Sequence, residues 1–154
     1  LPNYHGYDLG GIEVFWDVIS KRGIITIVQT RMEDPRRQHP MAIVDDVPVS
    51  DIVQIAERRA DIRFVIGGAR TGEIRAASDS LREQPNLYAD VSQADGLDAV
   101  RALVDDGIGK KLLFGSHAPL FMPRAAAARV VTDLEDDDAE LILEGNAKRL
   151  LSVK

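Results

Sequence analysis

The sequence predicts an α/β protein in which parallel strands alternate with helices. Short runs rich in Ile, Val and Leu recur along the chain, and amphipathic segments long enough for a helix separate them. Polar or acidic residues stand where several of these helices would begin. Such alternation requires right-handed crossovers, which gather the carboxyl ends of all strands at one edge of the sheet, where ligands bind.

The elements follow one another without a low-complexity tract or an interdomain linker. A chain of 154 residues matches one domain with a substantial core, so we expect a single domain over residues 1–154. The longest irregular segment, 31–48, joins one strand to one helix, and loops of this length are uncommon without a function. The predicted elements are helix 12–21, strand 23–30, helix 49–60, strand 62–68, helix 72–84, strand 86–92, helix 95–106, strand 111–116 and a last helix from 136 to 151.

Helix starts support these boundaries. Ser50 and Asp51 begin the second helix, and Thr71 can cap the third. Residues 136–138 are three aspartates, which place negative charge at the positive end of the last helix. These positions agree with the hydrophobic pattern, so the βα order is supported by two independent signals.

Side-chain alternation predicts a polar cluster at successive strand ends. In the third strand Leu87, Ala89 and Val91 point one way, which puts Asp90 on the opposite, polar face. Gln29 and Arg31 share one face of the first strand. His117 follows the last strand and continues one of its faces.

Composition excludes several classes of protein. The net charge is −6, so a nucleic-acid-binding surface is not expected, because binding phosphates needs a basic patch. No apolar run approaches the roughly 20 residues of a membrane span. There is no cysteine and no recognisable export signal, which points to a cytoplasmic protein without disulfides or thiolate sites.

Four motifs in order resemble the amidohydrolase-related (amidohydrolase 2) family, metal-dependent hydrolases and decarboxylases built on a TIM-like (β/α)8 barrel. They are "LPNYHGYDL", "RMEDPRRQHP", "LLFGSHAP" and "EGNAKRLL", and together they span nearly the whole chain. The resemblance implies that residues 1–154 are the second half of such a barrel, from the end of strand four through helix eight. The chain would then be an enzyme when the missing N-terminal half completes it.

The family's metal-binding positions have changed here. The resemblance implies paired metal histidines on strand one, upstream of this chain, while Gln29 stands at the strand-five histidine and His117 at the strand-eight aspartate. Zinc sites need three or more converging ligands, and an amide is a poor one. A divalent metal such as zinc is therefore expected only in the complete barrel. In this chain alone, His117 is at most a weak ligand.

The catalytic candidates are His117 and Asp90. His117 is suited to bind a metal or to transfer a proton near neutral pH, and the alternative is a loop histidine bonded to the backbone. Asp90 is suited to orient an imidazole or to act as a base, and the alternative is a loop cap.

Substrate contacts are expected from His5, Tyr4, Gln29, Arg31 and Arg36. His5 and Tyr4 follow the presumed strand four, where His5 could instead be a packed turn residue. The planar guanidinium of Arg31 offers two parallel donors to a substrate carboxylate, or alternatively to a neighbouring acidic residue at 33 or 34.

The resulting hypothesis is a hydrolase or decarboxylase that acts on a small, carboxylated molecule. A half barrel leaves two strand edges and an apolar inner face, so the missing half or a second copy of the chain is expected to cover them. The alternative, favoured by the altered metal positions, is a catalytically silent half barrel that serves as an assembly or binding module.

Overall fold

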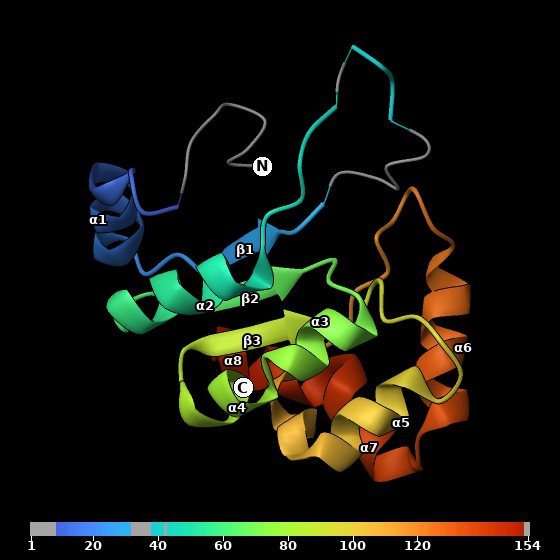
Figure 1. The fold of residues 1–154 in the computed structure, drawn as a ribbon. Coiled ribbons are helices and arrows are strands. Elements are labelled where there is room, and N and C mark those ends of the chain that lie inside the picture. The colour runs from blue at the N-terminus through green and yellow to red at the C-terminus, as the bar shows by residue number, and fades with distance from the viewer. Residues whose placement is uncertain (1–8, 32–37, 42, 153–154) are drawn as a thin grey trace.

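The computed structural model describes residues 9–31, 38–41 and 43–152, and its centre is a parallel β-sheet (Figure 1). The strands lie side by side in chain order, β1-β2-β3-β4, and each pairs in parallel with the next. This confirms the predicted α/β class with parallel βα repeats. The strands are β1 (Thr26–Gln29), β2 (Phe64–Gly67), β3 (Leu87–Asp90) and β4 (Leu112–Leu113).

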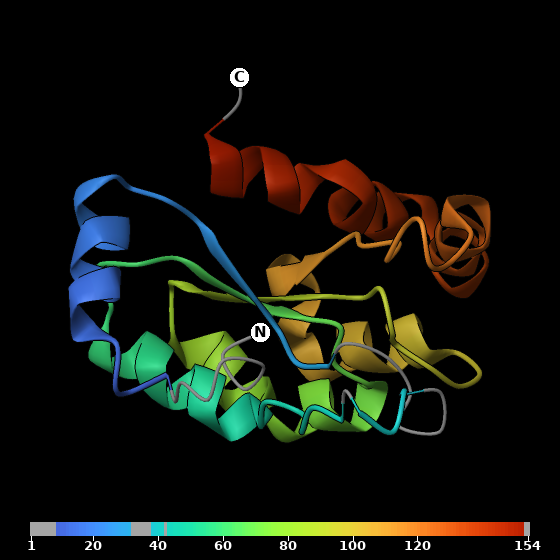
Figure 2. The same cartoon turned by 90° about the horizontal axis from the view of Figure 1, so that it is seen from above.

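Helices cover both faces of the sheet. In Figure 2, α2, α3 and α4 lie on one side of the strands and α8 lies on the other. Short 3-10 or π turns (η) connect or extend several of them. The segments are α1 (Glu13–Lys21), α2 (Val49–Arg58), α3 (Thr71–Ala76), α4 (Ser78–Glu83), α5 (Ala99–Leu103), η3 (Val104–Ile108), η4 (Gly109–Lys111), α6 (Pro123–Asp133), α7 (Asp136–Glu140), η5 (Leu141–Gly145) and α8 (Asn146–Leu151).

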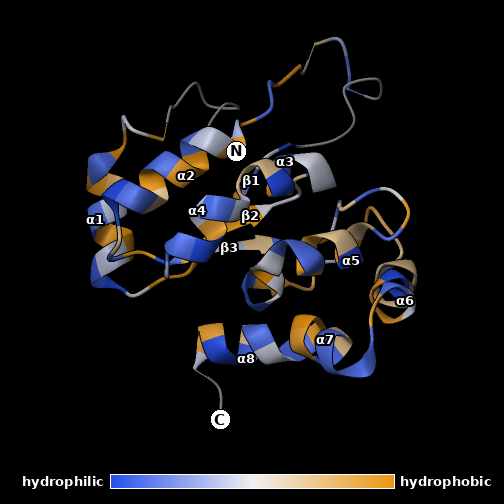
Figure 3. Ribbon diagram, turned by 60° about the horizontal axis from the view of Figure 1, so that its bottom comes forward, coloured by the Kyte–Doolittle hydropathy of each residue, from blue (hydrophilic) through white to orange (hydrophobic). Residues whose placement is uncertain are grey.

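Much of the main core lies between the sheet and the helices α2, α3 and α4. Apolar side chains of α2 and α4, such as Ile52 and Leu81, are fully buried there together with Phe64 and Leu87 from the strands. The helices carry hydrophilic and hydrophobic residues on the same segment, as Figure 3 shows for α2. Burial of an apolar stripe is the main source of stability for helices such as α2, which buries Ile52, Ile55 and Ala56.

A second, smaller cluster lies on the opposite face, which we call the inner face. Leu150 of α8 packs with Val65 of β2 and Leu113 of β4. Two side chains attach this helix. Nη1 of Arg63 donates to the carbonyl of Leu150 at 2.6 Å. Nδ2 of Asn146 donates to the carbonyls of Gly109 and Leu112 at 2.8 and 2.6 Å. α8 thus covers the inner face at the middle of β2 and at the carboxyl end of β4.

The predicted faces of the third strand are confirmed. Leu87, Ala89 and Val91 are buried in the main core. Asp90 lies on the other face and is only half-buried. The local alternation of polar and apolar residues was sufficient to place this carboxylate.

Three predicted elements differ from the structure. The helix expected over 72–84 is broken at Ala77, whose φ of −99° and ψ of 8° separate α3 from α4 while residues on both sides of the break remain fully buried. The helix expected from residue 95 begins only after Asp98, which has a left-handed φ of 51°. The strand expected over 111–116 pairs with its neighbour only at its start.

One helix was missed. α6 begins with Pro123 at its first turn and continues through four alanines, but it buries only Val130 among its residues. High helix propensity, and not a regular apolar period, forms this segment. A search for periodicity therefore passes over it.

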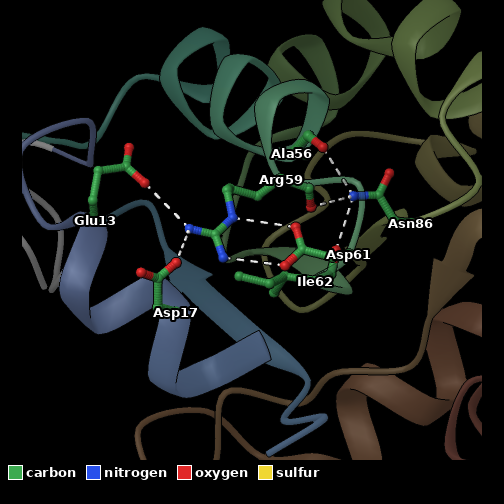
Figure 4. A network of polar contacts seen from close by, with 7 residues as sticks. All are labelled: Glu13, Asp17, Ala56, Arg59, Asp61, Ile62 and Asn86. Atoms are coloured by element: carbon green, nitrogen blue, oxygen red, sulfur yellow. Dashed lines mark hydrogen bonds and ion pairs between the residues drawn. The ribbon is translucent and has the colours of Figure 1, made fainter. Parts of the chain in front are cut away.

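A polar network joins α1, the end of α2 and the turn before β2 (Figure 4). The guanidinium of Arg59 donates to Asp61 with two nitrogens, at 3.2 and 3.1 Å, and to Glu13 and Asp17 at 3.2 and 3.0 Å. Beside it, the buried Asn86 donates through Nδ2 to the carbonyls of Ala56, Arg59 and Ile62 at 2.9, 3.2 and 2.8 Å. Asn86 therefore fixes the main chain that links α2 to β2.

Replacing Asn86 with alanine is expected to lower the free energy of unfolding by about 1–3 kcal/mol, because buried carbonyls lose their donor. Urea denaturation followed by circular dichroism measures the change. The matched control is Gln54→Ala on the exposed side of α2. A loss no larger than that of the control would mean that water replaces the amide at no cost.

The pH dependence of stability should include a contribution from Asp61. Hydrogen bonds from Arg59, and then from Ser20, lower the pKa of Asp61 from 3.8 to about 2. A carboxyl with a lowered folded-state pKa stabilises the fold above its unfolded value, and this contribution is lost as the pH falls from 3.8 to about 2. Thermal melts across this range should fall less steeply for Asp61→Asn than for the unaltered protein. If the melting temperatures of the two proteins fall equally with pH, other titratable groups cause the acid sensitivity.

Candidate functional site

Polar side chains meet at the carboxyl ends of β1, β2 and β3, around the glycine pair that ends β2. A Cβ placed on Gly68 would lie 2.1 Å from Nε2 of Gln29, and the Gly68 amide donates to Oδ1 of Asp90 at 3.2 Å. A Cβ on Gly115, which follows β4, would lie 3.1 Å from Cγ of Asp90. The structure thus brings together Gln29 and Asp90 at the predicted edge of the sheet.

Glycine is favoured at position 68 for two reasons. Its φ of +67° is a conformation that other residues rarely adopt. In addition, any side chain there would occupy the volume of the Gln29 amide. Because this position has no Cβ, the side-chain amide of Gln29 can lie against the backbone that follows β2.

Asp90 is held in one orientation by three donors. Its Oδ1 accepts from the amide of Gly68 at 3.2 Å and from the amide and hydroxyl of Ser92 at 2.9 and 2.6 Å. Within the described part of the chain, no donor meets Oδ2. One carboxylate oxygen therefore anchors the loop after β3, and the other is left for a ligand or a proton.

Arg31 has partners inside the protein. It is only 2% exposed, and its Nε, Nη1 and Nη2 donate to Asp46 at 3.1 Å, to the carbonyl of Gly68 at 2.6 Å and to Glu73 at 2.6 Å. Burial alone would lower the pKa of Arg31, but the hydrogen bonds and charges of Glu73 and Asp46 outweigh it and raise that pKa. These two carboxylates stand where a substrate carboxylate was predicted, so direct substrate contact would require an exchange of partners.

His117 lies in the loop between β4 and α6. It has a left-handed φ of 52°, and its carbonyl accepts from the amides of Leu120 and Phe121 at 3.0 and 3.2 Å. Its half-buried ring lies against the ring of Phe121, with 5.3 Å between centroids. The imidazole of His117 thus packs against a ring of its own loop. Its role in proton transfer stays a prediction.

Other predicted site residues lie outside the described part of the chain. These are Tyr4, His5 and Arg36. The acidic residues 33 and 34, considered as partners of Arg31, lie outside it as well.

The side chains present do not form a metal centre. Among the described residues, no three His, Asp or Glu side chains are grouped so that they could hold a metal ion. Gln29 brings an amide where the family resemblance implies a histidine, and amides are poor ligands for zinc. The described donor set therefore does not fit the family's metal.

Two features of the site were missed in the sequence. Gln93, directly after the third predicted strand, places its Nε2 3.4 Å from the Cβ position of Gly68. Glu73 reaches Arg31 from the first turn of α3. The sequence offers a signal only for Gln93, as a polar residue at a strand end.

Among the helices of the described residues, none combines the length and the apolar character needed to cross a bilayer. Comparison with curated proteins gives no match.

Several solved structures share the fold. An amidohydrolase 2 from Bifidobacterium longum subsp. infantis is 18% identical, with a TM-score of 0.63 over 94% of this chain and 56% of its own. A 2,6-dihydroxybenzoate decarboxylase in complex with 2,6-dihydroxybenzoate is 17% identical, with a TM-score of 0.67 over 96% and 56%. A dihydroxybenzoic acid decarboxylase from Polaromonas, with bound manganese and the inhibitor 2-nitroresorcinol, is 16% identical, with a TM-score of 0.64 over 96% and 55%.

The present chain spans about half the length of these structures. The predicted partial TIM-like barrel is thereby confirmed, because the four parallel strands align with about half of complete barrels. The family model for amidohydrolases (Amidohydro_2) matches residues 2–153. The chain therefore belongs to the amidohydrolase family.

Proposed function

We propose that this chain supplies part of the active site of a hydrolase or decarboxylase that acts on a small, carboxylated molecule. The observation that carries the proposal is the orientation of Asp90, whose Oδ1 is held by three donors while Oδ2 stays available at the carboxyl ends of the strands. Ligands of parallel α/β folds bind at this edge. The decarboxylases with the same fold are named for small aromatic acids, which supports this substrate class.

In this proposal Asp90 and His117 move protons. Asp90 accepts a proton at Oδ2 without reorienting, because its other oxygen is fixed. His117 donates or accepts a hydrogen bond from the loop after β4. Gln29 contacts the substrate, together with Tyr4, His5 and Arg36.

In this proposal, a metal ion would be bound by residues outside the described part of the chain. Zinc or another divalent ion would need histidine or carboxylate ligands supplied by the rest of a complete barrel. No step assigned to Asp90 or His117 depends on it. A cytoplasmic location is also part of the proposal, as the composition predicts.

The first, N-terminal half of the barrel is the proposed partner. Among the described strands, β1 and β4 each have a neighbour on one side only, and Ile27 of β1 is 64% exposed. Edge strands of this kind pair readily with further strands. The length of the related structures supports a preceding half barrel of the same protein as the occupant, and a second copy of this chain is the alternative.

A catalytically silent half barrel that serves as an assembly or binding module is the second candidate. The amide of Gln29 at a position implied to be a metal ligand favours it, since such a replacement weakens metal binding. Under this hypothesis the exposed edges are the functional surface, and Asp90 only anchors the loop after β3.

One set of measurements separates the two candidates. The chain, completed by the preceding half barrel, is purified and incubated with a panel of small aromatic and aliphatic acids and their amides, with and without added Mn²⁺ or Zn²⁺, and released CO₂ or ammonia is measured. Turnover is expected for the enzyme. Absence of turnover, together with a stable assembly of two or more copies in light scattering, would support the module instead.

A further inference from the structure

We propose that the side-chain amides of Gln29 and Gln93 form a donor pair that holds the oxygen of an uncharged carbonyl group beside Asp90. The inference rests on the proposed function for the identity of the site, and it goes further by naming the group that the site recognises. At this point of the strand ends it favours an uncharged amide over a carboxylate, so the carboxylate of the proposed substrate would lie in another part of the site.

The first observation is an unpaired donor. Nε2 of Gln29 is buried and has no hydrogen-bond partner among the described residues. Nearly all buried polar groups in proteins are paired, because burying one without a partner is unfavourable. An acceptor oxygen from a ligand would satisfy this nitrogen.

The second observation is the convergence of two amides on one glycine. The Cβ position of Gly68 lies 2.1 Å from Nε2 of Gln29 and 3.4 Å from Nε2 of Gln93. Gln29 belongs to β1 and Gln93 to the turn after β3, and each side chain is half-buried as a whole. Two NH₂ groups at one point can donate to a single oxygen from two directions.

The backbone beneath the pair is fixed. The amide of Gly68 donates to Asp90, and its carbonyl accepts from Arg31 at 2.6 Å. The preceding carbonyl, of Gly67, accepts from the amide and hydroxyl of Thr30 at 2.8 and 3.0 Å. The backbone on which a ligand would rest is thus ordered before the ligand arrives, which lowers the cost of binding.

The charged side chains around Gly68 determine whether a neutral or an anionic ligand oxygen binds more favourably. Asp90 adjoins the pair, and the positive charge of Arg31 is already shared by Asp46 and Glu73. Among the described residues, carboxylates therefore outnumber cations around Gly68, and these carboxylates would repel a second anion. A carbonyl of an amide accepts the same hydrogen bonds without that repulsion.

The test is an NMR titration of the full chain with benzamide and with benzoate, two probes of equal shape that differ in charge. The side-chain amide resonances of Gln29 and Gln93 are assigned by their loss in Gln29→Met and Gln93→Met. Benzamide is expected to shift both resonances saturably and to bind more tightly than benzoate. Gln29→Met should weaken benzamide binding about tenfold, since it keeps the length of the side chain and removes the donor.

Gln54→Met on α2 is the matched control and should leave the affinity unchanged. No saturable shift at either amide, tighter binding of benzoate, or unaltered affinity in Gln29→Met would each overturn the inference. Because no turnover is required, an inactive protein that still binds benzamide at these amides would contradict the proposed function and leave the donor pair standing.

Discussion

Replacing Asp90 with asparagine should lower turnover by about 10²- to 10⁴-fold, the usual contribution of a general acid or base. Asparagine keeps an acceptor oxygen for Gly68 and Ser92, so the loop after β3 stays anchored, while Oδ2 becomes an NH₂ group that cannot accept a proton. Steady-state kinetics on a substrate found in the acid and amide panel measure the loss, which should fall on kcat.

The matched control is Asp98→Asn, which makes the same change of charge at an exposed position of the loop before α5. Its turnover should equal that of the unaltered protein, and both variants should melt within a few degrees of it. Full activity in Asp90→Asn would leave this carboxylate a purely structural role.

Replacing Trp16 with alanine should lower the free energy of unfolding by about 3–5 kcal/mol, as for other large buried aromatic side chains. Trp16 is 2% exposed, and its ring meets the ring of Phe64 edge to face, with 5.4 Å between centroids. Its Nε1 also donates to the carbonyl of Leu9 at 2.7 Å. One side chain thus attaches α1 to the sheet and to the segment before it.

Chemical denaturation with an unchanged m-value would attribute the loss to the native state. The control is Val14→Ala on the same helix, where the side chain is 80% exposed and a change within about 0.5 kcal/mol is expected. Equal effects of the two substitutions would mean that α1 packs loosely and that its attachment does not depend on Trp16.

The order of strands and helices could be predicted because their signals are local. The apolar runs at β1, β2 and β3 and the alternation around Asp90 are visible within a few residues. The break at Ala77 is not, since it depends on how α3 and α4 pack on a sheet formed by distant segments. α6 lacked the apolar period on which the prediction relied.

The site was predicted in part for the same reason. Gln29 and Asp90 could be placed at strand ends from their own strands, but their meeting around Gly68 depends on the register between strands. The partners of Arg31 were beyond local reasoning, because Asp46 and Glu73 lie 15 and 42 residues further along the chain. Sequence proximity had favoured the nearer acidic residues instead.

The attachment of α8 has a consequence for the order of events during synthesis. Each strand pairs with the one made just before it, whereas the bond from Arg63 to Leu150 closes a loop of 87 residues. Closing a longer loop costs more entropy, and a chain emerges from the ribosome with its N-terminal side first. The strands can therefore pair as they are synthesised. Val65 and Leu113 remain exposed to water until the last helix has left the ribosomal exit tunnel. Chaperones can therefore bind these inner-face side chains until α8 packs on them, even after the sheet is complete.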